Sequence, residues 1–173
     1  MIALLRGASW RYSAMPPAQF SREVFEIRGM IEPHAASLAA ERSTADELAE
    51  IAAAYLSMER ADVPGNSAIQ ADLRFHRAIL AGAHNDLLLQ MGNLIGAGLL
   101  VSYRLSSDSL TVFLPRHKLV LDAIVARNPE AARAAMERLL AETREFLDAC
   151  FNKATGRGKR GDSSPRVSAG RGT

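Results

Sequence analysis

An aspartate and a histidine stand four residues apart in the stretch Asp72-Leu-Arg-Phe-His76. On a helix, two residues with this spacing point in nearly the same direction. Both fall on the apolar stripe of the predicted helix, which consists of Ile69, Leu73, Ile79, Leu80 and Ala83. The opposite, polar face consists of Gln70, Arg74 and Arg77. A carboxylate and an imidazole on a buried stripe need partners. They could satisfy each other or an arginine, or they could bind a metal ion, because both are good metal ligands.

The elements that would position this pair are all helical. No stretch of the sequence alternates apolar and polar residues like a strand, whereas apolar residues recur at helical spacing along most of the chain. We therefore predict an all-α fold, an antiparallel bundle of about six helices. The predicted helices cover about residues 20–42, 45–60, 67–83, 86–105, 110–128 and 129–150.

Local signals mark where several helices begin. Thr44 and Glu47 have the spacing of a capping box, and Asn85 is a candidate N-cap. Pro129 follows Asn128 at a first helical position. The first helix has an apolar stripe made of Phe20, Val24, Ile27, Ile31, Ala35 and Leu38. The fifth places His117 on one stripe with Leu114, Leu121 and Ile124, and the sixth buries Ala132, Ala135, Met136, Leu139, Phe146 and Leu147.

Length and composition indicate one domain with two short flanks. The chain has 173 residues, of which 48% are hydrophobic, enough for one core. We expect residues 1–18 to be a linker or a remnant of an upstream segment, 19–151 to be the folded domain, and 152–173 to be a disordered basic tail. The tail holds six Lys or Arg against one Asp, so the folded part is acidic and is not typical of a nucleic-acid surface.

Other classes of protein are disfavoured by what the chain contains. Its single cysteine, Cys150, excludes an internal disulfide and a multi-cysteine zinc site. No apolar run approaches the roughly 20 residues of a membrane span. The sequence therefore predicts a cytoplasmic protein without a membrane contact.

Short segments in order along the chain resemble one family. They are Glu26-Ile-Arg28-Gly-Met-Ile-Glu32-Pro33, Leu38-Ala-Ala-Glu-Arg-Ser-Thr44, Asp72-Leu-Arg-Phe-His76, Ala83-His-Asn85, His117 with Leu121-Asp-Ala-Ile124, and Pro129-Glu-Ala-Ala132 through Met136. Together they resemble the FCD domain, the effector-binding domain of the FadR subfamily of GntR transcription regulators. The resemblance covers about residues 20–150.

This resemblance implies a helical bundle that binds a small organic acid, with a divalent metal (zinc, nickel or manganese) in the pocket of many members. The family's metal ligands map to Asp72, His76 and His117. The fourth ligand position maps to Leu139, which cannot coordinate a metal. An alternative is a pocket without metal, in which Asp72 and the histidines hydrogen-bond each other.

The resemblance also suggests residues that bind the effector. Arg28 matches an arginine that can point into the pocket, although an i, i+4 pair with Glu32 would explain it equally well. Asn85, Tyr103 and Arg104 are further candidates, and Asn85 also fits a capping role. We expect His34 and His84 to be surface residues.

Family members pair as homodimers and bind DNA through a winged helix-turn-helix that precedes this domain. Only about 20 residues precede the match here, too few for that module. The sequence leaves open an excised domain, a late start codon and a stand-alone sensor. We therefore expect a homodimer whose effector is a small organic acid, with DNA bound only through a winged helix-turn-helix absent from this chain.

Two other functions compete with an effector-sensing domain. An open Asp/His/His metal site could activate water in a metal-dependent hydrolase. However, the inner stripes of the third and fifth predicted helices offer no spare carboxylate as a general base, so we do not expect an enzyme. A purely structural helical dimer would place apolar residues, rather than Asp72 and His76, in its core.

Overall fold

The fold is all-α, as predicted, in a computed structural model that describes residues 16–61, 66–92, 95–96 and 109–158. No strand occurs among these residues. The helices are α2 (Pro17–Arg42), α3 (Ala45–Glu59), α4 (Asn66–Gly82), α5 (Asp86–Gln90), α7 (Ser109–Val125) and α8 (Pro129–Gly158). Within the described part of the chain, no helix is long and apolar enough to cross a membrane.

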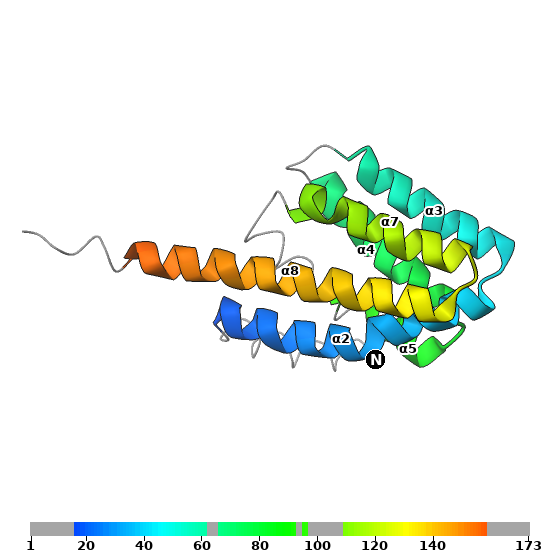
Figure 1. The fold of residues 1–173 in the computed structure, drawn as a ribbon, viewed down its shortest axis with the longest axis horizontal. Coiled ribbons are helices and arrows are strands. Elements are labelled where there is room, and N and C mark those ends of the chain that lie inside the picture. Colours follow the sequence, from blue (N-terminus) through cyan, green and yellow to red (C-terminus); the bar gives the residue numbers. More distant parts are fainter. Residues whose placement is uncertain (1–15, 62–65, 93–94, 97–108, 159–173) are drawn as a thin grey trace, which may run out of the picture.

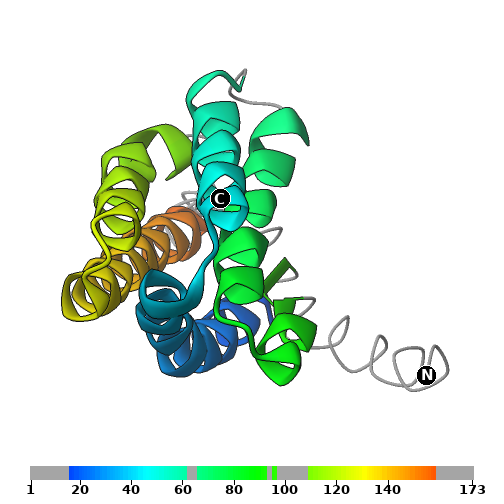
Figure 2. The ribbon, with the colours of Figure 1, turned by 90° about the vertical axis from the view of Figure 1, so that its right-hand side faces the viewer.

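The two longest helices form one side of the bundle. α2 and α8 lie side by side and antiparallel along the long axis of the molecule, and α7 packs against α8 (Figure 1). α3 and α4 pack on each other, and α4 also contacts α2. Figure 2 shows the bundle from its end, with α2 in contact with α4, α7 and α8. α2 is therefore placed to reach any site formed between α4 and α7.

The predicted helix starts are confirmed in detail. Thr44 and Glu47 form a complete capping box, with Glu47 Oε2 accepting from the Thr44 backbone N–H at 2.8 Å. Asn85 Oδ1 accepts from the backbone N–H groups of Leu87 and Leu88, at 3.1 and 3.2 Å. Pro129 is the first residue of α8. Short-range capping patterns are local chemistry, so the sequence is sufficient to locate them.

Helix ends differ most from the predictions in two places. α8 continues to Gly158, beyond the predicted end near Cys150, so the first residues of the segment assigned to the tail are helical. The predicted helix from 86 to 105 is described as α5, Asp86–Gln90, followed by short pieces up to residue 96. The remainder of that predicted helix, and residues 1–15 and 159–173, lie outside the described residues.

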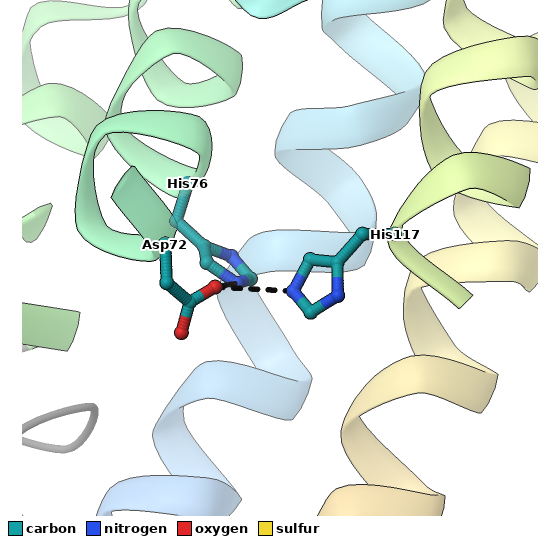
Figure 3. A group of neighbouring side chains, drawn as sticks. All are labelled: Asp72, His76 and His117. Atoms are coloured by element: carbon teal, nitrogen blue, oxygen red, sulfur yellow. Dashed lines mark ion pairs between the residues drawn. The ribbon is translucent and has the colours of Figure 1, made fainter. Parts of the chain in front are cut away.

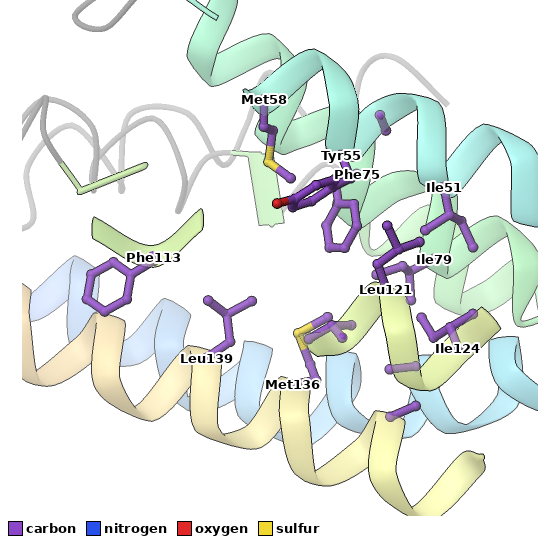
Figure 4. Packing of buried hydrophobic residues seen from close by; sticks show 14 of the residues in the cluster. Ile51, Tyr55, Met58, Phe75, Ile79, Phe113, Leu121, Ile124, Met136 and Leu139 are labelled. Atoms are coloured by element: carbon purple, nitrogen blue, oxygen red, sulfur yellow. The ribbon is translucent and has the colours of Figure 1, made fainter. Parts of the chain in front are cut away.

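The main core lies between α2, α3, α4, α7 and α8. Figure 4 shows Phe75 and Ile79 of α4 facing Leu121 and Ile124 of α7 and Met136 of α8. The predicted polar face of α4 is exposed, and the predicted core positions of α8 at Ala132, Met136, Leu139 and Leu147 are buried.

The buried face of α2 is wider than the predicted apolar stripe, of which Phe20, Val24 and Ala35 are buried. Ile27, Ile31 and Leu38 are only half-buried. The helix also buries residues outside that stripe, two of them ionisable: Ser21, Phe25, Arg28, Glu32, Ala36 and Ala39. The hydropathy pattern missed Arg28 and Glu32 because an arginine and a carboxylate that pair with each other can occupy interior positions.

Candidate metal centre

Asp72, His76 and His117 converge at one point between α4 and α7. One ligand atom from each residue lies within 4.8 Å of the others. Asp72 Oδ1 is 3.4 Å from His76 Nε2 and 3.1 Å from His117 Nε2. Figure 3 shows both imidazole rings directed toward the same carboxylate oxygen. The structure thus brings together the three residues that the sequence proposed as metal ligands.

Helix geometry and packing explain this convergence. Asp72 and His76 share one face of α4 because they are four residues apart. His117 arrives from α7, where its neighbours Phe113, Val120 and Leu121 are buried. The Phe75 ring lies edge-on to both imidazoles, with centroids 5.8 Å from His76 and 5.4 Å from His117. Both histidine rings are therefore held by apolar packing as well as by polar contacts.

The far nitrogen of each imidazole also has an acceptor. His117 Nδ1 lies 2.9 Å from the backbone carbonyl oxygen of Phe113. His76 Nδ1 lies 2.5 Å from Glu32 Oε2, although the angle of this contact is not that of a good hydrogen bond. At this distance two atoms with lone pairs would repel, so we assign a proton to His76 Nδ1. With Nδ1 protonated in both rings, a neutral imidazole presents its lone pair at Nε2, toward Asp72.

Glu32 is a functional candidate that the sequence analysis missed. It was considered only as a partner of Arg28, and that contact is present: Arg28 Nε donates to Glu32 Oε1 at 2.5 Å. Both side chains are only 2% exposed. The second carboxylate oxygen, Oε2, faces His76 from a different helix. The signal in the sequence was the appearance of Arg28 and Glu32 four residues apart, but nothing in it pointed to His76.

The charges in this cluster shift its ionisation strongly. Burial alone would raise the pKa of Glu32, but the nearby charges of Arg28 and His76 outweigh it and lower that pKa to about 2. For His76, burial alone would lower the pKa, but Glu32 and Asp72 raise it to about 9. Burial likewise opposes ionisation of Asp72, yet the adjacent imidazoles of His117 and His76 hold the pKa of its carboxyl far below the usual range. The site is therefore built to hold positive charge beside two carboxylates.

This donor set fits a divalent metal. Asp72 Oδ1 is fully buried, and its contacts with the two Nε2 atoms lack good hydrogen-bond geometry. Two neutral imidazoles and a carboxylate oxygen in this arrangement direct three electron-rich atoms at one another, which requires a cation between them. That cation can be a proton or a metal ion. One carboxylate and two imidazoles, each oriented through its other nitrogen, are characteristic ligands of zinc and related metals.

The other residues that the sequence suggested lie outside the metal-ligand cluster or outside the described residues. Asn85 caps α5, and His84 is a surface residue whose Nε2 lies 2.8 Å from Glu47 Oε2. His34 is exposed. Arg28 forms the i, i+4 pair with Glu32 that was one of its two expected roles, and its contact with an effector stays a prediction. Tyr103 and Arg104 lie outside the described residues.

Comparison with known proteins identifies relatives that are regulators. The model of the FCD domain matches residues 23–142. The galactonate operon transcriptional repressor of Escherichia coli K12 is 31% identical over 128 residues, which are 71% of this chain and 56% of the relative. The HTH-type transcriptional regulator LutR of Bacillus subtilis is 29% identical over 140 residues, which are 76% of this chain and 64% of the relative.

A further curated relative and a solved structure agree with this result. The putative L-lactate dehydrogenase operon regulatory protein of E. coli K12 is 32% identical over 124 residues, which are 68% of this chain and 47% of the relative. A Streptococcus agalactiae GntR structure has the same fold, with a TM-score of 0.67 at 24% identity, covering 78% of this chain and 62% of that one. The chain thus spans less than two thirds of the length of these relatives, and the three curated ones are named as regulators.

The match to the FCD model covers most of the described helices, and the fold agrees with it. The chain belongs to the FCD domain family of GntR-type transcription regulators.

Proposed function

We propose that this chain is the effector-sensing and dimerisation domain of a FadR-subfamily regulator, and that its effector is a small carboxylate bound through a divalent metal. The observation that carries the proposal is the convergence of Asp72, His76 and His117 on one point. When bound, the metal would supply a positive charge that attracts a carboxylate into an apolar bundle. Zinc, nickel and manganese are the candidate ions.

The effector must reach the three ligands from solvent. Asp72 Oδ1 is buried, but 17% of the Asp72 side chain is exposed, so one edge of the cluster faces the outside. Three protein ligands also leave coordination positions for oxygen atoms of a small molecule. Leu139, at the position where the family has a fourth ligand, adds no donor. This favours an effector that itself completes the coordination.

The names of two relatives narrow the chemical class of effector. One regulates a galactonate operon and another is named for an L-lactate dehydrogenase operon. Galactonate and L-lactate both carry a hydroxyl on the carbon next to the carboxylate, so both can offer two oxygen atoms to one metal. We therefore propose a hydroxy acid or sugar acid as the effector of this chain.

Metal binding is tested by elemental analysis of protein purified without a chelator. We expect a divalent ion in the wild type and its loss in His76→Ala. His84→Ala is the matched control, because it removes an imidazole that pairs with a carboxylate at the surface. Absence of metal in the wild type, even after incubation with zinc, nickel or manganese, would refute metal binding.

The effector class is tested by thermal denaturation of the metal-loaded protein. Galactonate, L-lactate and other hydroxy acids should raise the melting temperature with concentration, as mass action requires. Propionate, which lacks the hydroxyl of lactate, should raise it less. If neutral or cationic compounds alone stabilise the protein, a carboxylate effector is the wrong class.

The proposal assigns DNA binding to a separate module. The relative LutR is named as an HTH-type regulator, and we propose that this chain acts with such a module in the cytoplasm rather than contacting DNA itself. The excess of acidic residues in 19–151 supports this, because DNA-binding surfaces are basic.

A further inference from the structure

One carboxylate on α2 contacts two cationic partners from different helices. Glu32 Oε1 accepts from Arg28 Nε at 2.5 Å, one turn earlier on α2. Glu32 Oε2 lies 2.5 Å from His76 Nδ1 on α4. Glu32 and His76 are each about 2% exposed, so water does not compete effectively for either group. Each carboxylate oxygen of Glu32 therefore has its own partner: Oε1 contacts Arg28, and Oε2 contacts His76.

We infer that Glu32 is a positioning residue for His76: it keeps a proton on Nδ1 and turns Nε2 toward Asp72, while Arg28 holds Glu32 in place. This inference deepens the proposed metal site and rests on it for its functional meaning. Histidine ligands of metals commonly donate their other ring N–H to a carboxylate, which fixes the tautomer and the ring orientation. Glu32 Oε2 lies in the place of such a carboxylate, 2.5 Å from His76 Nδ1.

The two histidines of the site are oriented by different kinds of acceptor. His117 Nδ1 faces the backbone carbonyl of Phe113 on its own helix, so the acceptor for this nitrogen comes from α7 itself. His76 Nδ1 faces a side chain of another helix, so its orientation depends on how α2 packs against α4. A change at Glu32 should therefore affect His76 and leave His117 unchanged. His117 is an internal control within the same molecule.

A simpler role for Glu32 would be to neutralise the buried Arg28. That role requires one of the two oxygens, and it does not explain why Oε2 lies against His76 at 2.5 Å. A substitution separates the two roles. Glutamine has the shape of glutamate but one acceptor oxygen, and it cannot serve the N–H donors of Arg28 and His76 together. The amide NH₂ of the glutamine must then face either Arg28 or His76, and it cannot accept a hydrogen bond from either.

The main experiment compares wild type with Glu32→Gln. The zinc affinity of each folded protein is measured by competition with a chromophoric chelator. We expect Glu32→Gln to bind zinc about 10–100-fold more weakly, the usual effect of removing such a partner of a histidine ligand. Glu50→Gln is the matched control, because Glu50 also accepts from an arginine Nε, at 2.8 Å, but on the surface. Its zinc affinity should equal that of the wild type.

A second readout follows the imidazole protons by NMR in the metal-free protein. The Nδ1–H signal of His76 should exchange slowly with solvent in the wild type and be lost in Glu32→Gln. The Nδ1–H signal of His117 should persist in both proteins. This measurement does not require metal. The backbone amide signals in the same spectra show whether the variant is folded.

A rescue variant removes the competing donor. In Arg28→Met combined with Glu32→Gln, the glutamine oxygen has only His76 to accept from. Zinc affinity and the Nδ1–H signal should both recover toward the wild type. Recovery of zinc affinity without the Nδ1–H signal would mean that Glu32 acts only by neutralising Arg28.

The outcomes separate this inference from the proposed function. If folded Glu32→Gln keeps the Nδ1–H signal of His76 and binds zinc within about threefold of the wild type, well below the usual effect, Glu32 does not position His76. If the wild type binds no zinc but loses the His76 signal on Glu32→Gln, the metal proposal fails and the positioning of His76 by Glu32 stands.

Discussion

At the scale of residues, this domain places unusual charge in its interior. Arg28, Glu32, His76 and His117 are all buried, and Asp72 is nearly so. Removing one member of a buried charge pair leaves the other without compensation, which is strongly destabilising. Such an arrangement often stabilises a folded core less than apolar residues of similar volume would. We attribute it to the proposed ligand site, whose charges would be arranged before a ligand arrives.

The raised pKa of His76 predicts how metal affinity depends on pH. In the metal-free protein the pKa of His76 is about 9, so below that pH a proton must leave before His76 can ligate a metal. Apparent affinity should rise by about tenfold per pH unit between pH 7 and 8.5. Nickel titrations in that range measure the slope. A plateau above pH 7 would mean that His76 titrates like an exposed imidazole.

Leu139, which we map to the family's fourth ligand position, offers a gain-of-function test. It is 2% exposed and belongs to the core cluster that contains Phe75, whose ring contacts both histidines. Leu139→His should destabilise the metal-free protein by about 1–3 kcal/mol, because it buries a polar group without a partner. With zinc or nickel, the new imidazole should raise metal affinity and recover that stability.

Melting curves with and without metal, for the wild type and for Leu139→His, test this expectation. Leu139→Ala is the companion variant, and it should cost about 2–5 kcal/mol with no metal-dependent recovery. Equal stabilisation of wild type and Leu139→His by metal would place residue 139 away from the ligands.

At the scale of elements, the contact between α2 and α4 controls the site, because it brings Glu32 to His76. Near the ends of these helices the contact is close. A Cβ on Gly82, the last residue of α4, would lie 2.3 Å from Ser43 Oγ and 3.6 Å from Ala39 Cβ. Ser43 Oγ also donates to the Gly82 carbonyl at 3.4 Å. The absence of a side chain at Gly82 thus sets how closely α4 approaches the end of α2.

Gly82→Ala should therefore destabilise the protein by about 1–3 kcal/mol through overpacking. The matched control is Gly29→Ala, an exposed helix position where a Cβ meets nothing within 4 Å. That substitution should stabilise by about 0.5–1 kcal/mol, since alanine favours a helix more than glycine. Urea denaturation of both variants measures the difference, and adding Ser43→Ala to Gly82→Ala should relieve part of the loss. Equal stabilities of the two glycine variants would contradict the close contact.

At the scale of the whole molecule, the chain is a helical bundle of the FCD family with apolar side chains left on its outside. Val112 and Leu119 of α7 are 52% and 45% exposed, and they lie seven residues apart on one face of that helix. The predicted helix from 86 to 105 carries glycines at 92, 96 and 98, and most of it lies outside the described residues.

We predict that the chain forms a homodimer with no sequence-specific affinity for DNA. Exposed apolar residues favour self-association, and the acidic balance of residues 19–151 opposes phosphate binding. Sedimentation equilibrium should give twice the mass of the chain, and a promoter fragment should not shift in an electrophoretic assay at physiological salt. A stable monomer, or tight binding of one specific DNA sequence by this chain, would contradict the prediction.

The sequence by itself determined the features that local geometry fixes. Helical periodicity predicted the all-α fold, and the capping box at Thr44 and the cap at Asn85 followed from side chains that bond to backbone within three residues. The spacing of Asp72 and His76 placed them on one face of α4 for the same reason, since a helix relates residues four positions apart without reference to the rest of the chain.

Tertiary structure decided which groups from other helices meet that pair. Hydropathy placed Ile27 and Ile31 on the inner face of α2, whereas packing turned Arg28 and Glu32 inward. The partner of His76 Nδ1 is thus a carboxylate from α2, and the second imidazole comes from α7. These contacts depend on the rotation and the distance of helices that are remote in sequence. No local spacing encodes either quantity, because both result from the packing of the whole core.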